Sequence, residues 1–289
     1  MTDKRIPEEV IAAIVEQTLK EDLGSDGDIT SAALFSDDDR ATAEIKSKSQ
    51  GVLSGAYLLE PVFSRLDPRL RVEGLLSDGS TVLPGTMIAT VTGPIRGILA
   101  GERTVLNFLQ RLSGIATVTS RFTAAISGAS CRLLDTRKTT PLLRCFEKAA
   151  VEHGGGCNHR FGLFDMMLIK DTHVRRSGGV APALERAIAY RSATGNPALQ
   201  IEVEVQSEEE FEAALRYRPD RIMLDNMTVT AMHRCVALRS AEQPDVALEA
   251  SGNVTLETIG AIAATGVDYI SSGALTHSAP ALDIHLIIR

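Results

Sequence analysis

Two kinds of hydrophobic pattern divide the chain. In its first part, apolar residues recur at helical spacing from Pro7 to Leu19 and then alternate with polar residues over 41–48, which predicts a helix and a half-buried strand. A second helix is expected over 57–65, and short strands are expected at 69–74 and 86–93, bounded by Gly- and Pro-containing turns. This order of elements predicts an α+β module.

A long amphipathic helix is expected from about residue 101. Its apolar face consists of Val105, Phe108, Leu109 and Leu112. Arg103 and Arg111 lie off that face, so the packing of the helix does not require them.

After Ser130 the pattern changes to short apolar segments separated by helical stretches. These segments occupy 131–135, 165–170, 199–205, 220–225, 245–251 and 266–273. The segment ends Glu204, Asp225, Ser251 and Gly273 follow one another at intervals of 21 to 26 residues, enough for one strand, one loop and one helix. Such repetition is typical of a parallel α/β barrel, whose active site lies at the carboxyl ends of the strands.

Composition excludes some classes of partner. The 289 residues carry a net charge of −7, with a pI near 5.5, which does not favour nucleic acid or an anionic membrane. The four cysteines form no CxxC pair, which suits a reducing cytoplasm. The charged amino terminus lacks the apolar core of a signal peptide, and no apolar run approaches the roughly 20 residues of a membrane span.

Cationic residues follow the first barrel segments. Arg137 and Lys138 lie among threonines directly after a predicted strand, His159 and Arg160 follow three glycines, and Lys170 ends the next strand. Together these residues could bind a polyanionic ligand although the whole chain is acidic. The alternative for the first pair is a solvated basic turn.

Carboxylates and small residues follow the later strands. Glu202 and Glu204 lie on one face of a strand because side chains alternate, and Asp225 ends the next strand. Carboxylates of this kind suit Mg²⁺ or ribose hydroxyls, and the alternative is a structural lattice of ion pairs within the barrel. The Gly/Ser loops at 250–253 and 271–273, with His277 nearby, suit a phosphate group.

Taken together, the motifs LLDTRKTTP, HGGGCNHRFGLFDMMLIKDTH, IEVEV, MLDNM, LEASGN and GVDYISSGALTHSAPALD resemble those of the quinolinate phosphoribosyltransferase family in type and order. The resemblance extends over nearly the whole chain, including GERTVLNFLQRLSGIAT upstream. It implies an amino-terminal α/β sandwich domain at 1–115, an open, incomplete α/β barrel at 116–274, and a segment at 275–289 that returns to the first domain.

The resemblance also implies an activity and residue roles. The family transfers phosphoribosyl from phosphoribosyl pyrophosphate (PRPP) to quinolinate with decarboxylation, using Mg²⁺, in a homodimer whose active sites are shared. The quinolinate wall would consist of Arg103, Arg137, His159, Arg160 and Lys170. Lys138 would face the pyrophosphate, and Glu204 and Asp225 would hold ribose hydroxyls and Mg²⁺, so that the catalytic set is Lys138, Lys170, Glu204 and Asp225. The 5-phosphate pocket would consist of Ser251, Gly252, Asn253, Ser272, Gly273 and His277, with Lys138.

The sequence departs from the family pattern at a few positions. Thr172 replaces an expected asparagine, while Asn253 and Leu142 replace expected glycines, which puts in doubt a backbone phosphate contact at Asn253. Arg175 and Arg176 add charge beyond the usual pattern. None of these changes removes a charged residue of the predicted centre.

Three other functions fit some of the same residues. A molybdenum-operon homologue of the same superfamily would share the RKTTP and phosphate-loop features, although the intact HRFGLFDMMLIKD stretch favours quinolinate. A barrel lyase could use Lys170 as a Schiff-base nucleophile. A non-catalytic binding protein would give no reason for metal-type carboxylates opposite so many cations.

Overall fold

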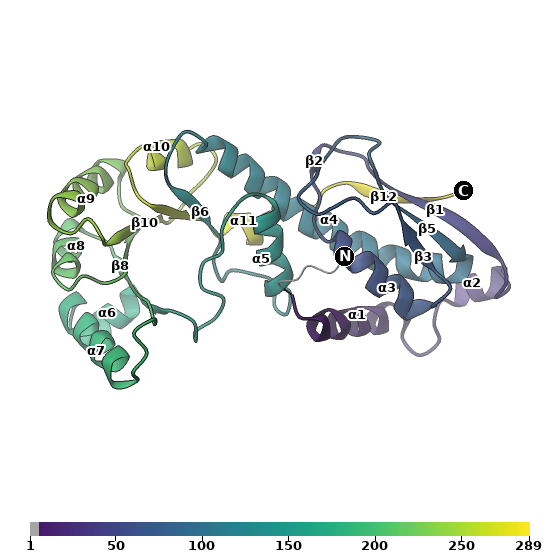
Figure 1. Cartoon of the computed structure of the whole chain (residues 1–289), viewed down its shortest axis with the longest axis horizontal. Helices are drawn as coiled ribbons and strands as arrows, with labels where there is room; N and C mark the ends of the chain where they lie inside the picture. Colours follow the sequence, from purple (N-terminus) through teal and green to yellow (C-terminus); the bar gives the residue numbers. More distant parts are fainter. Residues whose placement is uncertain (1–5) are drawn as a thin grey trace. The chain divides into compact units, whose positions relative to one another are not determined.

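The computed structural model describes residues 6–289, and the chain divides into two compact units (Figure 1). Of the described residues, the first unit takes 6–120, Thr140–Gly155 and Ala279–Arg289. The second unit takes Arg121–Thr139 and Gly156–Ser278. The charged start of the chain, considered above for a signal peptide, lies partly outside the described residues.

The first unit contains an antiparallel sheet of four strands in the order β12-β1-β5-β3. Their bounds are β1 Arg40–Ser47, β3 Arg71–Glu73, β5 Met87–Pro94 and β12 Ile284–Ile288. A separate antiparallel pair is formed by β2 Gly51–Val52 and β4 Thr81–Val82. The carboxyl-terminal strand β12 pairs with β1, so the end of the chain completes the sheet of the first unit.

Helices complete the first unit. They are α1 Glu8–Leu23, α2 Ile29–Leu34, the 3-10 turn η1 Ala56–Leu58, α3 Leu59–Leu66, most of α4 Ile95–Ala125, and α5 Arg144–His153. The predicted apolar face of α4 is confirmed, since Val105, Leu109 and Leu112 are almost fully buried. The helix begins several residues earlier than expected, directly after β5. Helix α1 also runs further than expected and ends at Gly24, whose φ of 54° departs from helical geometry.

The second unit is built on a parallel sheet of six strands in the order β6-β11-β10-β9-β8-β7. Their bounds are β6 Arg132–Leu134, β7 Met167–Ile169, β8 Ile201–Val205, β9 Arg221–Asp225, β10 Ala247–Ser251 and β11 Tyr269–Ser271. Strands β6 and β7 follow each other in the chain but lie at opposite edges of the sheet, which therefore does not close. The predicted open α/β barrel after an amino-terminal α+β domain is confirmed.

Five helices lie along the outer side of these strands (Figure 1). They are α6 Asp171–Ser177, α7 Val180–Ala193, α8 Glu208–Leu215, α9 Val229–Glu242 and α10 Ile259–Ala263; the short α11 Ala274–His277 follows β11. Side-chain caps begin two of them, since Ser207 accepts from the Glu210 N–H and Thr228 from the Ala231 N–H. Within residues 6–289, every helix is too short or too polar to cross a membrane.

Because both faces of a parallel sheet are covered, its strands are expected to be almost entirely apolar. Glu202 in β8 and Glu249 in β10 break this rule, since both are 0% exposed. A carboxylate buried in an otherwise apolar strand is expected to have a specific role, because its burial costs stability.

Candidate active site

The predicted cations lie at the carboxyl-terminal ends of strands of the parallel sheet. Arg137 and Lys138 come after β6, Arg160 lies in the loop before β7, and Lys170 follows β7. The carboxyl ends of parallel strands lie on the same side of the sheet, and Cys157 forms a parallel bridge with Leu134 of β6, so Arg160 follows at that side too.

Two guanidinium groups lie close together among these cations. Burial, and then the positive charge of Arg137, lower the pKa of Arg160. Arg160 Nη1 donates to the Met166 carbonyl over 3.0 Å, which orients its side chain. Arg137 Nε is buried and makes no hydrogen bond to the described residues. Two neighbouring cations with donor capacity to spare form a site suited to carboxylate groups.

Of the predicted carboxylates, Glu204 lies beside Lys170, and Asp225 lies near Glu204. Lys170 Nζ is 3.7 Å from Glu204 Oε1, and the Asp171 N–H donates to Glu204 Oε2 over 3.3 Å. Burial raises the pKa of Glu204, Lys170 opposes that rise, and the charge of Asp225 adds to it. The Asp225 carboxylate accepts a hydrogen bond from Asn226 Nδ2 over 3.0 Å. Two interacting carboxylates at adjacent strand ends suit a hard cation such as Mg²⁺.

The loops after β9 and β10 are joined at Asn226. Its backbone N–H donates to the Ser251 carbonyl over 2.9 Å, and its side-chain Oδ1 accepts from Asn253 Nδ2 over 3.2 Å. Gly252 has a φ of 94°, and a Cβ placed on it would lie 2.2 Å from Asn226 Oδ1. Glycine is therefore required at this position by both backbone conformation and space.

The loop after β11 brings together Lys138, Gly273 and His277. A Cβ on Gly273 would lie 2.8 Å from the Lys138 side chain and 2.9 Å from the His277 ring. Thr276 Oγ1 donates to the Lys138 carbonyl over 2.8 Å. Ser272 was expected to line the phosphate pocket. Its side chain is buried instead, and its Oγ donates to the Val254 carbonyl over 3.2 Å.

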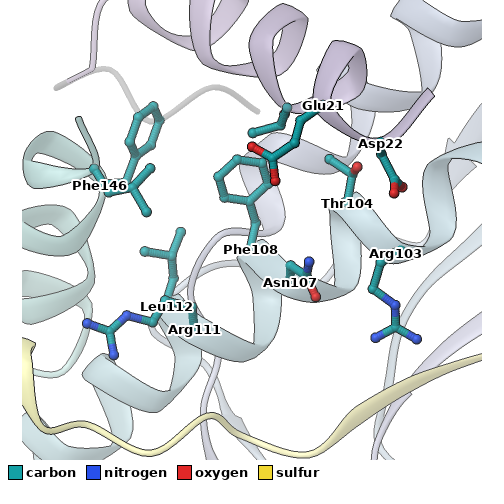
Figure 2. A pocket seen from close by; sticks show the side chains of 11 residues that line it. Glu21, Asp22, Arg103, Thr104, Asn107, Phe108, Arg111, Leu112 and Phe146 are labelled. Atoms are coloured by element: carbon teal, nitrogen blue, oxygen red, sulfur yellow. The ribbon is translucent and has the colours of Figure 1, made fainter. Parts of the chain in front are cut away.

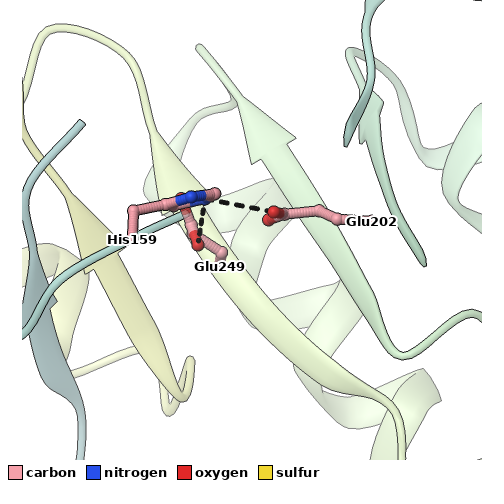
Figure 3. Close-up of side chains that lie close together, drawn as sticks. All are labelled: His159, Glu202 and Glu249. Carbon is pink, nitrogen blue, oxygen red and sulfur yellow. Dashed lines mark ion pairs between the residues drawn. The ribbon is translucent and has the colours of Figure 1, made fainter. Parts of the chain in front are cut away.

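His159 differs most from expectation. Its side chain is only 6% exposed, and its Nε2 lies 3.1 Å from Glu202 Oε2 and 3.5 Å from Glu249 Oε2 (Figure 3). Although burial lowers its pKa, these two carboxylates raise the pKa of His159 to about 9 overall. The ring thus faces two buried carboxylates, whereas it was expected to line the wall formed by the other cations.

These three residues are also a possible metal-binding group, since their ligand atoms lie within 4.8 Å of one another. Arg221 Nη1, however, lies 2.7 Å from Glu249 Oε2 and packs over the Tyr269 ring at 4.1 Å. A guanidinium therefore already supplies positive charge inside this group.

Arg103 lies in the first unit, on α4. It lines a cavity of about 290 Å³ whose walls come from α1, α4, α5 and the residue before α5. Figure 2 shows Phe108 and Phe146 within this cavity, and Glu21 and Asp22 on the neighbouring helix. The cavity combines apolar walls with arginine and carboxylate side chains, so it could accommodate a group that has both apolar and charged parts.

Comparison with known proteins assigns the chain to a family. The family model described as "Quinolinate phosphoribosyl transferase, N-terminal domain" matches residues 28–113, and the model of the C-terminal domain matches 115–287. The chain belongs to the quinolinate phosphoribosyl transferase family.

The chain is similar to individual members of this family over most of their lengths. The chain is 41% identical over 290 aligned residues to quinolinate phosphoribosyltransferase [decarboxylating] 1b of Nicotiana tabacum, covering 96% of this chain and 82% of that protein. It is 42% identical to the probable nicotinate-nucleotide pyrophosphorylase [carboxylating] of Bacillus subtilis, covering 92% and 89%. The solved structure of the nicotinate-nucleotide pyrophosphorylase of Francisella tularensis has a TM-score of 0.91 and 38% identity, covering 100% of this chain and 99% of that one.

The departures from the family motif occupy defined places in the fold. Asn253 has a φ of 51° and Leu142 a φ of 66°, so both keep the left-handed backbone that the expected glycines favour. Asparagine tolerates this conformation better than most residues, and its amide contacts Asn226. Thr172 is exposed, and its N–H donates to the Asp171 carboxylate over 2.6 Å.

The structure adds residues that sequence reasoning did not single out. These are Asp135, Arg221, Asn226, Glu249 and Thr276. A signal for two of them was present, because Asp135 and Glu249 are acidic residues at the end of or within apolar strands, two positions before Arg137 and Ser251. Asn226 and Thr276 gave no such signal, since polar residues are common in loops.

Proposed function

We propose that this chain transfers the phosphoribosyl group of PRPP to quinolinate and releases pyrophosphate and CO₂, giving nicotinate mononucleotide. The observation that carries the proposal is the cluster of Arg137, Arg160 and Lys170 with Glu204 and Asp225 at the carboxyl-terminal ends of the barrel strands, in a member of this family. Quinolinate is a dicarboxylate and PRPP is polyanionic, so both substrates match a positive wall.

The reaction depends mainly on positioning and electrostatics. The pyridine nitrogen forms a bond to the anomeric carbon while the bond from that carbon to pyrophosphate breaks. The bond to the adjacent carboxylate then breaks, CO₂ leaves, and a proton from water takes its place on the ring. Arg137, Arg160 and Lys170 hold the carboxylates of quinolinate, and Lys138 faces the pyrophosphate.

The residues around the two phosphate loops hold PRPP. Ser251, Gly252 and Asn253 after β10 and Gly273 with His277 after β11 offer backbone N–H groups and a ring to the 5-phosphate. Ser272 supports these loops through its bond to Val254.

Glu204 and Asp225 are the proposed ligands of Mg²⁺ and of the ribose hydroxyls. Glu204 is partly buried and its carboxylate interacts with that of Asp225, an arrangement that fits a hard cation. Bound there, Mg²⁺ offsets negative charge on the departing pyrophosphate. Asp225→Ala should therefore weaken PRPP binding, measured by calorimetry with Mg²⁺ present, more than quinolinate binding. Unchanged PRPP kinetics in a folded Asp225→Ala variant would make Asp225 a structural residue only.

The proposal includes a homodimer with shared active sites, to which Arg103 of one chain contributes at the barrel of its partner. The cavity beside Arg103 supports this, because it offers apolar packing next to a cation outside the barrel unit. A reducing compartment such as the cytoplasm suits the four free cysteines.

The direct test is to incubate the purified protein with quinolinate, PRPP and Mg²⁺. Nicotinate mononucleotide, pyrophosphate and CO₂ should form in equal amounts. Absence of all three products from folded protein would refute the proposal. Borohydride trapping with carbonyl substrates tests the lyase alternative, which requires a Schiff base on Lys170.

A further inference from the structure

A layer of charged side chains lies inside the barrel unit, one step along the strands from the candidate site. Glu202 precedes Glu204 by two residues in β8, and Glu249 precedes Ser251 by two residues in β10. Since side chains alternate along a strand, each buried glutamate shares a face with its neighbour at the strand end. His159, next to Arg160, inserts its ring between the two glutamates (Figure 3).

Three contacts fix His159 in this layer. Its backbone N–H donates to Asp135 Oδ1 over 2.8 Å, and its Nε2 faces the carboxylates of Glu202 and Glu249. The backbone N–H of Arg160 donates to His159 Nδ1 over 2.7 Å. Asp135 is buried and precedes Arg137 by two residues. The residues that make these contacts therefore lie next to, or two positions before, the two arginines of the candidate site.

We propose that His159 is a positioning residue that anchors the Arg160 loop to the buried glutamates and thereby sets the place of the Arg160 guanidinium. This inference rests on the proposed function and assigns His159 a role apart from direct contact with quinolinate. The substrate carboxylates then meet Arg137 and Arg160, while the imidazole supports them from inside the unit.

The charges within the layer explain why the ring stays there. Glu202 and Glu249 are fully buried, and a buried carboxylate is costly unless it is paired. Arg221 pairs with Glu249 over 2.7 Å, which leaves Glu202 to His159. Each buried carboxylate therefore has a cationic or donor side chain beside it, Arg221 for Glu249 and the His159 ring for Glu202. With Nδ1 accepting from Arg160, the ring proton lies on Nε2, which faces the carboxylates.

The decisive variant is Glu202→Leu, because Glu202 is 0% exposed and cannot touch a substrate. We expect the quinolinate kcat/KM to fall about 10- to 100-fold, through misplacement of Arg160. The KM for PRPP should change less than about twofold, because Glu202 acts on Arg160, which is proposed to hold quinolinate, whereas PRPP is proposed to be held by the loops after β10 and β11. His159→Ala should have the same effect, and the double variant should be no worse than either single variant, since residues acting through one contact are not additive.

The matched control is Asp268→Leu, which removes a carboxylate from the opposite ends of the barrel strands. Asp268 accepts from the Leu248 N–H over 2.7 Å and pairs with Arg239 at 3.4 Å. This variant should lower thermal stability and leave the KM for quinolinate unchanged. If Glu202→Leu does not fold, Glu202→Gln keeps the size of the side chain and a weaker acceptor, and the expected loss is about threefold.

The inference is overturned if either folded Glu202 variant keeps the wild-type KM for quinolinate while His159→Ala raises it, since His159 would then bind the substrate directly. It is also overturned if elemental analysis finds a metal ion that His159→Ala and Glu202→Leu release, because the three residues would then be metal ligands. Wild-type protein that makes no nicotinate mononucleotide would instead refute the proposed function.

Discussion

At the scale of single residues, the site depends on backbone conformations that few side chains tolerate. Gly252, Asn226 and Asn253 all have positive φ, and hydrogen bonds through the Asn226 side chain connect Asn253 to the Asp225 carboxylate. The residue types at these three positions therefore set both the path of the phosphate loop and the orientation of the Asp225 carboxylate.

Gly252→Ala should impair the use of PRPP. Its Cβ would lie 2.2 Å from Asn226 Oδ1, so Asn226 must move and the contact with Asp225 is lost. We expect the KM for PRPP to rise about tenfold or more, with a strain of about 1 to 3 kcal/mol from the positive φ. Gly195→Ala is the control, since Gly195 also has a positive φ of 64° but open space around it. Steady-state kinetics should show an effect on PRPP only for Gly252; equal effects would attribute the loss to strain alone.

His159 should make folding stability depend on pH. Its folded pKa of about 9 exceeds the pKa of about 6.5 of an ordinary histidine, so its stabilising contribution is complete below pH 6.5 and is lost as pH rises through 9. The free energy of unfolding should fall by up to about 3 kcal/mol over that range. Urea titrations of wild type and His159→Gln, whose side chain does not titrate, isolate this slope. Parallel pH profiles would exclude the pairing of His159 with the glutamates.

At the scale of elements, β12 shows how the end of the chain contributes to its beginning. Besides the ladder with β1, Gln110 Nε2 donates to the Ile284 carbonyl over 2.7 Å, and Arg289 pairs with Glu44 over 2.7 Å. The exposed ion pair contributes little, whereas burial of the apolar face of the strand contributes most.

Two isoleucines of β12 separate these contributions. Ile284 is 1% exposed and Ile287 is 36% exposed. Ile284→Ala should lower the free energy of unfolding by about 2 to 4 kcal/mol, because it leaves a cavity in the core. Ile287→Ala should cost under about 1 kcal/mol. Chemical denaturation measures both, and similar losses would mean that strand pairing, not burial, dominates.

At the scale of the whole molecule, the proposed shared active site predicts how much activity dimers of two different variants should have. Arg103 lies in the first unit and Lys170 in the second, so each can be inactivated without changing the other. In a twofold dimer each interface contact occurs twice, and each barrel would receive the arginine of its partner.

Arg103→Ala and Lys170→Ala homodimers should both be nearly inactive. Mixed dimers should contain one doubly damaged site and one intact site, because the intact Arg103 belongs to the chain that lacks Lys170. Random exchange makes about half of the dimers mixed, so roughly a quarter of wild-type activity should return. Mixed dimers isolated through different tags on the two chains should retain about half of wild-type activity, since each has one intact site out of two. Inactive mixed dimers would mean that Arg103 acts within its own chain or has no role.

Much of this protein could be predicted from local pattern. The period of two in IEVEV, the apolar face at Val105 and Leu109, and the repeated strand segments each follow from short-range side-chain geometry. The cations and carboxylates at the strand ends could be predicted in the same way, since the carboxyl ends of parallel strands lie on one side of the sheet.

Only the tertiary structure decided which charges pair. Glu202 and Glu204 are indistinguishable in the pattern, yet one is buried against His159 and the other lies beside Lys170. Glu249 and Arg221 lie near His159 and Glu202 because β8, β9 and β10 pair in a particular register, which the sequence pattern does not give. Pairing depends on distances between residues far apart in the chain, and strand register sets those distances, whereas a local pattern records only which side chains share a face.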